Sequence, residues 1–340
     1  MAKFSSKSQS EFKSVLRSVL RPELGSDGRF DNKFDSKSRM AGRIEIIAPG
    51  SSSKVSDVQQ AIQNMQALGY EIQFDEKIFS DHPYLAQNDE KRFQHLESAL
   101  QGAANILWCS RGGYGCLRLM PFLAKIKKPK RIQPQKWLVG YSDITSLHLF
   151  LNHFWKMPTI HGSVFEAWGV DRVDKNDLQE TLLLLHLLTN NKKARMSYPL
   201  QPMNLAAEKS KKITGMLTGG NLAVLTSHLG TPYIWSSGKK ILMLEDIGER
   251  GYRLDRYLNQ LKMSSIYKTV QAIVFGQFTG GNEVDGKNHV ELALTDFVET
   301  TKVPCFRSTE FGHGTRNRPL VFGSTVDINK NEMHWSTSSL

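Results

Sequence analysis

Apolar strand-like segments alternate with helix-like segments through the first half of the chain. Residues 43–49 read as a buried strand, and apolar positions at helical spacing follow over 55–68. The succession then continues with a strand over 70–74, a helix over 89–100 and a strand over 105–109. Strands that alternate with helices across short loops are typical of βαβ units, so we expect a doubly wound, mainly parallel sheet covered on both faces.

The pattern changes in the second half. Its strand-like segments lie at 241–244, 272–278, 320–328 and 333–336. Its helix-like segments lie at 220–228, 252–261 and 289–299. We therefore expect an α/β domain over 43–188 and a smaller, β-rich α+β domain over 213–340. Residues 189–212 are polar, contain two prolines and show no period, which favours an inter-domain linker.

Residues 1–42 differ from the rest of the chain in composition. Up to Arg43 the segment carries ten Lys/Arg against five Asp/Glu, so it supplies +5 of the formal +11. It is rich in serine and lacks the apolar stretch of a secretory signal. We interpret it as a flexible basic extension outside the fold, and a docking arm is one role that fits this composition.

Overall composition narrows the class of protein. The 340 residues are 40% hydrophobic and contain no apolar run near the ~20 residues of a membrane span. Three cysteines make a disulfide framework improbable and favour a reducing, cytoplasmic compartment. The basic cluster at 125–136 lacks interleaved aromatic residues, which indicates a solvated loop and no nucleic-acid partner; a positive surface equally attracts a small acidic substrate.

One segment combines a strand, a turn and a helix around a serine. The apolar run 137–139 leads into Gly140-Tyr141-Ser142-Asp143, and apolar residues at helical spacing follow over 147–151. A serine on such a turn is typical of a nucleophile elbow, where the helix N-terminus favours a developing anion. The alternative is that Ser142 and Asp143 cap the helix.

A serine nucleophile needs a base, and the base needs an acid to orient it. His313 lies in a loop with glycine on both sides, where catalytic groups are common. Glu245 ends the apolar run 241–244 and either caps a turn or faces a cleft. For His153 and His161 we expect local hydrogen bonds, and for His186 a half-buried place on a helix.

A glycine-rich loop follows the strand at 105–109. It reads Arg111-Gly112-Gly113-Tyr114-Gly115 and matches neither the dinucleotide fingerprint nor the P-loop. Its backbone N–H groups suit a phosphate or an oxyanion, and Arg111 suits a substrate carboxylate.

Six blocks in this order resemble the LD-carboxypeptidase family, serine peptidases that include the microcin C self-immunity enzymes. They are IAP at 47–49, RGGYGCLR at 111–118, GYSDIT at 140–145, GGNL at 219–222, LED at 244–246 with DR at 255–256, and GH at 312–313 with Pro319 and Gly323. The resemblance implies a Ser-His-Glu triad of Ser142, His313 and Glu245, with an oxyanion hole formed by the N–H groups of Gly113 and Asp143. It further implies release of terminal D-alanine from murein tetrapeptide, no metal or cofactor, and a homodimer.

Substrate contacts are expected from five side chains: Arg111, Tyr114, Asn221, Glu249 and Arg253. Glu249 and Arg253 also fit a solvated, salt-bridged helix face. Two other functions stay open. One is an immunity peptidase acting on a peptidyl or aminoacyl nucleotide, for which Trp168 is a candidate recognition residue, although a core tryptophan is the simpler reading. The other is a non-catalytic peptide-binding protein with Ser142 as a cap.

Overall fold

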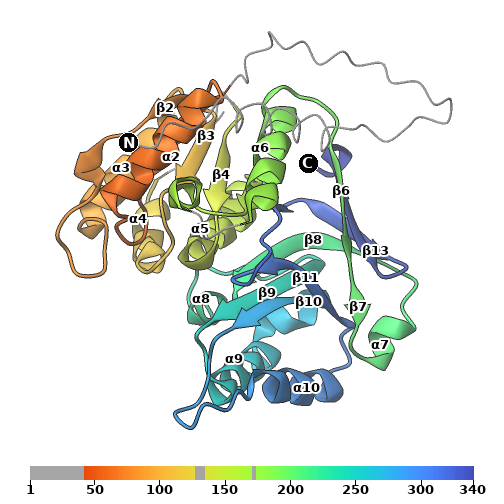
Figure 1. Cartoon of the computed structure of the whole chain (residues 1–340). Helices are drawn as coiled ribbons and strands as arrows, with labels where there is room; N and C mark the ends of the chain where they lie inside the picture. The colour runs from red at the N-terminus through yellow and green to blue at the C-terminus, as the bar shows by residue number, and fades with distance from the viewer. Residues whose placement is uncertain (1–41, 127–134, 171–173) are drawn as a thin grey trace, which may run out of the picture.

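The computed structural model describes residues 42–126, 135–170 and 174–340, and these form two β-sheets with helices packed on both (Figure 1). The predicted extension, apart from Gly42, and the basic stretch 127–134 lie outside the described residues. No helix in the described ranges combines the length and apolar character needed to cross a bilayer.

The first sheet has the strand order β12-β5-β4-β3-β1-β2. Its strands are β1 (Arg43–Ile47), β2 (Glu71–Gln73), β3 (Ile106–Cys109), β4 (Trp137–Gly140), β5 (Thr159–His161) and β12 (Leu320–Phe322). All neighbours are parallel except β12, which runs antiparallel to β5. Because parallel strands end at one edge of a sheet, the turn after β4 lies where ligands bind in such folds.

Helices cover both faces of this sheet. α2 (Val55–Ala67) and α6 (Lys175–Thr189) share one apolar cluster with β1, β3 and β4. α3 (Asp89–Gln101), α4 (Met120–Leu123) and α5 (Thr145–Phe150) pack with the opposite side chains of the same strands. Strands buried on both faces explain the nearly continuous apolar runs in the sequence, and the predicted doubly wound α/β arrangement is confirmed.

The second sheet has the order β6-β14-β13-β8-β9-β10-β11-β7. Its strands are β6 (Arg195–Pro199), β7 (Gln201–Pro202), β8 (Lys212–Asn221), β9 (Lys240–Ile247), β10 (Val270–Thr279), β11 (Cys305–Gly312), β13 (Thr325–Asn329) and β14 (Glu332–Ser336). The central strands β8 to β11 are parallel and are linked by α8 (Leu222–Ser227), α9 (Gly251–Met263) and α10 (Val290–Thr300). These helices pack on β9 and β10, and α9 and α10 lie side by side in Figure 1.

Two sequence-based expectations need correction. The stretch 189–212 is not a structureless linker, because β6 pairs with β14, β7 pairs with β11, and α7 (Leu205–Glu208) follows. These are edge strands with mostly exposed side chains, so they leave no hydrophobic signal. The segment 320–328 forms two strands in different sheets, since the chain turns at residues 323–324.

Lys136 is a further correction. The basic loop was expected to be solvated, yet Lys136 is only 2% exposed, and its ammonium group donates to the carbonyls of Gly102 and Ala104. Burial lowers the pKa of this lysine. Its place at the start of β4 fixes the strand that leads to Ser142.

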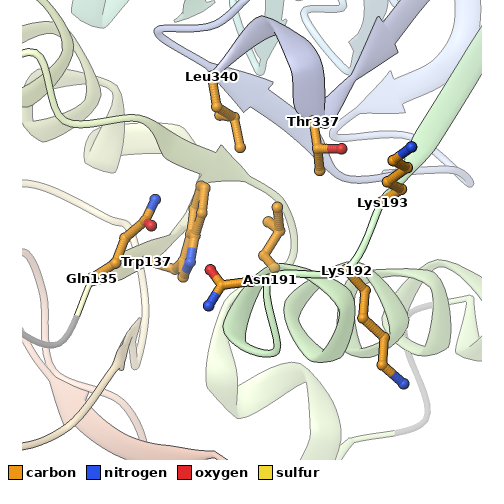
Figure 2. Close-up of a pocket in the computed structure, with 8 residues that line it drawn as sticks. Gln135, Trp137, Asn191, Lys192, Lys193, Thr337 and Leu340 are labelled. Atoms are coloured by element: carbon orange, nitrogen blue, oxygen red, sulfur yellow. The ribbon is translucent and has the colours of Figure 1, made fainter.

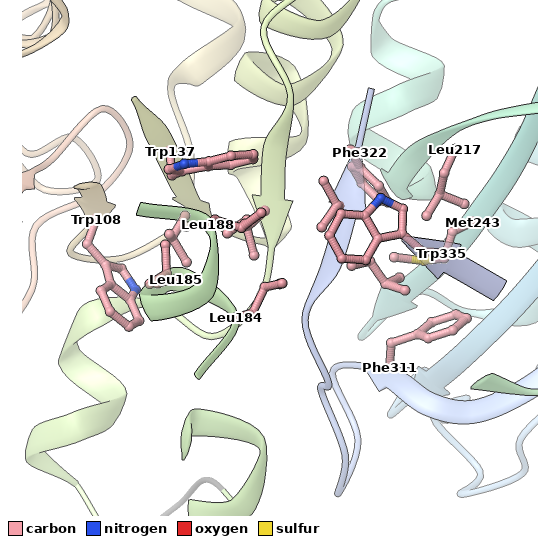
Figure 3. Packing of buried hydrophobic residues seen from close by; sticks show 14 of the residues in the cluster. Trp108, Trp137, Leu184, Leu185, Leu188, Leu217, Met243, Phe311, Phe322 and Trp335 are labelled. Atoms are coloured by element: carbon pink, nitrogen blue, oxygen red, sulfur yellow. The ribbon is translucent and has the colours of Figure 1, made fainter. Parts of the chain in front are cut away.

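One apolar cluster joins the two sheets. It runs from Trp108 and Trp137 of the first sheet, past leucines of α6, to Leu217, Met243 and Trp335 of the second. Figure 3 shows these side chains on both sides of the boundary. The site described next depends on this contact, because its residues come from both sheets.

Candidate active site

Ser142 occupies a strained turn. Its φ of 65° lies in the left-handed region, which is uncommon for a residue other than glycine. The serine begins a short 3₁₀ turn, Ser142–Ile144, between β4 and α5. Neither that turn nor α5 has a side-chain N-cap hydrogen bond, so Ser142 and Asp143 do not serve as caps. A strained, half-buried hydroxyl after a parallel strand is the geometry of a nucleophile elbow.

The glycine-rich loop packs directly against this turn. A Cβ on Gly112 would lie 2.8 Å from the Cβ of Ser142, so only glycine fits there. Two contacts hold the loop: Ser51 N–H donates to the Gly112 carbonyl at 3.0 Å, and the Asp143 carboxylate accepts from Cys116 N–H at 2.8 Å. Among the described residues the Gly113 N–H donates no turn or loop hydrogen bond, and it stays available as an anion donor.

Glu245 and His313 meet from opposite sides of β10. Glu245 lies on β9 and is fully buried, whereas His313 directly follows β11. The Nδ1 atom of His313 is hydrogen-bonded to Oε2 of Glu245, which leaves Nε2 as the nitrogen able to take a proton. This is the imidazole–carboxylate half of a catalytic triad in its usual tautomeric arrangement.

Tyr141 connects this pair to the serine turn. The Tyr141 and His313 rings are tilted, with centroids 4.6 Å apart, and Tyr141 is the residue before Ser142. The imidazole therefore lies beside the elbow. In the described part of the chain Ser142 itself forms no side-chain hydrogen bond, and such contacts are often long in free enzymes. Apart from its place in the GYSDIT block, Tyr141 has no feature in the sequence that would predict this contact.

The surroundings of His313 favour its charged form. Burial lowers the pKa of the imidazole, but the charge and hydrogen bond of Glu245, together with Asp246, outweigh burial and raise it above the ordinary value. Asp246 is buried next to Glu245, and these two effects raise the pKa of the Asp246 carboxyl to about 7. Burial raises the pKa of Tyr141 to about 12, so its hydroxyl remains protonated.

The elbow helix docks on the end of β8. A Cβ on Gly220 would lie 2.4 Å from the Thr145 hydroxyl, and the Asn221 N–H donates to that hydroxyl at 3.0 Å. Asn221 pairs with Glu245 across β8 and β9. The GGNL block thus brings the carboxylate strand against the helix that begins just after the serine.

Arg111 and Tyr114 are exposed beside the elbow. They are 49% and 51% exposed, and within the described residues Arg111 forms one ion pair, a long one of 3.9 Å with Glu166. A pocket of about 310 Å³ adjoins them, lined by Ser51, Ser52, His82, Pro83, Tyr84, Arg111 and Gly113. Its place next to Gly113 makes Arg111 the cation best placed for an anionic ligand.

The other three expected substrate contacts differ. Asn221 is 5% exposed; its amide donates to Asp246 at 2.8 Å and its carbonyl accepts from Val224 N–H, so it is a helix cap and not a surface contact. Glu249 lies just before α9 and pairs at 3.4 Å with Arg253 in the first turn of that helix. The ion pair given above as their alternative is present, but only Arg253 is on the helix.

Three buried histidines near the first sheet, His148, His153 and His161, do not compete as bases. His148 bonds Thr159 and the Gly140 carbonyl, and His153 bonds Thr218 at 3.0 Å, which confirms local satisfaction for His153. His161 is fully buried beside Tyr141 with the Asn317 side chain close to it, although neither ring nitrogen has a hydrogen bond of good geometry within the described residues. Burial lowers the pKa of His161 well below its usual value, so the ring is neutral.

Two further side chains, Cys116 and Trp168, are not suited to a role in the reaction. Cys116 is buried, and burial together with Asp143 raises its thiol pKa, so it is not a nucleophile. Trp168 is half-buried and packs edge-on against Trp108 with ring centroids 6.2 Å apart, as expected of a core residue. A separate pocket of about 210 Å³ contains none of the predicted site residues (Figure 2). It is lined by Gln135, Trp137, Leu188, Asn191, Lys192, Lys193, Thr337 and Leu340.

A hydroxyl on a strained elbow, beside a buried imidazole–carboxylate pair, is the arrangement of a hydrolase. Comparison with known proteins identifies the family. Residues 44–162 match the LD-carboxypeptidase N-terminal domain, and residues 214–328 match the LD-carboxypeptidase C-terminal domain. The chain belongs to the LD-carboxypeptidase family.

Relatives and solved structures agree with this assignment. A putative carboxypeptidase of Rickettsia conorii is 35% identical over 85% of this chain and 88% of its own length. The murein tetrapeptide carboxypeptidase of Pseudomonas aeruginosa is 29% identical over 86% of this chain and 95% of its own. The crystal structure of muramoyltetrapeptide carboxypeptidase from Oxalobacter formigenes superposes with a TM-score of 0.70 at 26% identity, covering 86% of this chain and 98% of that one.

Proposed function

We propose that this protein is a serine carboxypeptidase that releases terminal D-alanine from murein tetrapeptide by hydrolysing an L,D amide bond. The observation that carries the proposal is the buried Glu245–His313 pair lying against the strained turn of Ser142. The names of the murein tetrapeptide carboxypeptidase relatives support the substrate. The formal charge of +11 suits an acidic peptide.

The geometry supports a two-step acyl transfer. Ser142 Oγ attacks the amide carbon while Nε2 of His313 takes its proton, and Glu245 holds the tautomer and stabilises the imidazolium. The N–H groups of Gly113 and Asp143 stabilise the oxyanion. His313 then protonates the leaving amine of D-alanine, and water hydrolyses the ester with His313 again as base.

The function is tested with purified protein and two muropeptides. Tetrapeptide should yield D-alanine and tripeptide, detected by mass spectrometry, whereas tripeptide, which lacks the terminal residue, should be unchanged. Absence of D-alanine from the tetrapeptide at high enzyme concentration would exclude this substrate.

Arg111 provides a prediction on specificity. If its guanidinium binds the terminal carboxylate, Arg111→Ala should raise KM about 10- to 100-fold with little change in kcat, because a charged hydrogen bond contributes about 1.5–3 kcal/mol. Arg111→Lys should lose less. The matched substrate is a tetrapeptide with a C-terminal amide. The wild type should bind this amide weakly, and its KM should equal that of Arg111→Ala. A difference in KM that persists on the amide would contradict binding of the carboxylate by Arg111.

Glu245 provides a prediction on pH dependence. Glu245→Gln should lower kcat about 10³- to 10⁴-fold, since an amide no longer selects the tautomer. His313 faces Glu245, Asp246, Tyr141 and His161. The base acts when neutral, so its raised pKa puts the acid limb of kcat/KM above about pH 6.5.

Without the Glu245 charge, burial becomes the main influence on the pKa of His313. That pKa should therefore fall, and the acid limb of kcat/KM should move to lower pH. Asp246→Asn, the control that removes only the weaker of the two neighbouring charges, should move it less. An acid limb that stays in place in Glu245→Gln would show that His313 does not report on this carboxylate.

We propose that the protein acts in the cytoplasm and that it forms a homodimer. All three cysteines are free and buried, as suits a reducing compartment. The alternative is a nucleotide substrate, as in the immunity branch. Trp168, its candidate recognition residue, packs against Trp108 and so does not favour it. A panel of tetrapeptide and peptidyl-nucleotide substrates separates the two.

A further inference from the structure

The loop that carries His313 is anchored to both sheets. Ser142 follows β4 in the first sheet, whereas His313 follows β11 in the second. A base on one sheet can serve a nucleophile on the other only if their relative position is fixed to within a fraction of an ångström. Two polar anchors hold the loop, one from each side.

The first anchor is Gln277 of β10. Its amide donates to the carbonyls of Thr309 and Arg316 at 2.7 and 2.9 Å, and its oxygen accepts from Thr315 N–H at 3.0 Å. Because β10 lies between β9 and β11, this anchor fixes the loop relative to Glu245.

The second anchor is Asp177 of α6, the helix packed on the first sheet. Its Oδ1 accepts from Nε and Nη2 of Arg316 at 3.0 and 2.9 Å, and its Oδ2 accepts from Asn317 N–H at 2.6 Å. The Asp177 side chain is completely buried. Buried charge-assisted bonds of this kind are strong and directional.

A second pair repeats the contact along the same helix. Glu180 accepts two hydrogen bonds from Arg318, at 2.8 and 2.7 Å. Residues three apart on a helix share a face, and residues two apart on an extended segment do the same, so Asp177 and Glu180 match Arg316 and Arg318. The helix therefore holds the loop in one register.

We propose that Asp177 is a positioning residue for the catalytic base. By holding Arg316 and Asn317 against α6, it sets His313 against the Ser142 turn on the first sheet. The inference rests on the proposed function, because it assumes that His313 takes the proton of Ser142.

The test measures how fast Ser142 reacts with a small fluorophosphonate, a probe that needs no peptide recognition. Asp177→Asn keeps the side-chain shape and removes the charge. Its labelling rate constant should fall about 10- to 100-fold, while the final stoichiometry stays at the wild-type level. A merely structural role would lower the stoichiometry, through loss of folded protein, and leave the rate constant of the folded fraction unchanged.

Arg316→Gln breaks the contact from its more exposed side and covers the case in which Asp177→Asn does not fold. It should slow labelling equally, and the double variant should be no slower than either single one. The control is Glu291→Gln, which breaks the exposed 2.7 Å pair with Arg307 of β11 and should leave the rate unchanged.

Labelling of Asp177→Asn and Arg316→Gln at the wild-type rate constant would overturn the inference. Failure of the wild type to label at Ser142 would overturn the proposed function, and the inference with it. The two failures are therefore distinguishable in one experiment.

Discussion

Ser142→Ala should lower kcat for D-alanine release by on the order of 10⁴–10⁶-fold. In the proposed mechanism the Ser142 hydroxyl oxygen becomes acylated, and two neighbouring groups in the described site are not free to replace it: Cys116 is buried with a raised thiol pKa, and Thr145 accepts a hydrogen bond from Asn221. The substitution leaves the proposed oxyanion donors unchanged, so a small residual rate should remain. The measurement is single-turnover release of D-alanine followed by mass spectrometry.

Two controls accompany this variant. Ser56→Ala removes an exposed serine on α2 and should retain wild-type turnover. Binding of tetrapeptide to Ser142→Ala, measured by calorimetry, should stay close to that of the wild type, because the hydroxyl acts mainly in the transition state. Turnover by Ser142→Ala within tenfold of the wild type would rule out Ser142 as the nucleophile.

His313→Ala should cost about as much as the loss of the serine, again on the order of 10⁴–10⁶-fold in kcat. Without the imidazole the serine keeps its proton, and the buried Glu245 loses its hydrogen-bond partner. Groups that act as a unit are not additive, so the double variant with Ser142→Ala should be no slower than either single variant. Single-turnover rates of the three proteins provide the test.

His148→Ala is not a suitable comparison, because that ring bonds Thr159 and the Gly140 carbonyl within the core. The exposed His334, whose only ion pair in the described structure is with Glu332 at 3.5 Å, is the matched control. His334→Ala should leave kcat unchanged. If the fold losses in rate of the two single variants multiply in the double variant, Ser142 and His313 act independently.

Local features of the site were predictable from the sequence. An apolar strand, a short turn and helical spacing limited Ser142 to two roles, an elbow or a helix cap, and the positive φ of that serine with the missing cap hydrogen bonds favours the elbow. The alternation of strands and helices predicted the doubly wound first sheet. Such features are local, so a single sequence contains them.

Long-range contacts were not predictable from periodicity. Glu245 and His313 are 68 residues apart, and only the family resemblance placed them together. Asp177 and Arg316 are 139 residues apart, and an aspartate in the first turn of a helix is ordinary in a sequence. The pairing of β12 with β5 in the first sheet was not predictable for the same reason, since alternation of apolar and polar residues does not identify a partner strand.

Burial was the other source of error. Lys136 reads as part of a basic loop but lies in the core, with carbonyl oxygens as partners. Asn221 reads as a polar group near the site but caps α8. In both cases backbone groups are the hydrogen-bond partners of the side chain, and composition does not reveal such partners.

The most direct test of the account is to identify the residue that becomes acylated. Wild-type protein is mixed with murein tetrapeptide, quenched in acid within the first turnover, and digested for peptide mapping by mass spectrometry. The account predicts a burst of D-alanine and a tripeptidyl ester on Ser142. A burst with the adduct on another residue, or D-alanine release at a rate within tenfold of the wild type from protein whose Ser142 is replaced by alanine, would contradict it.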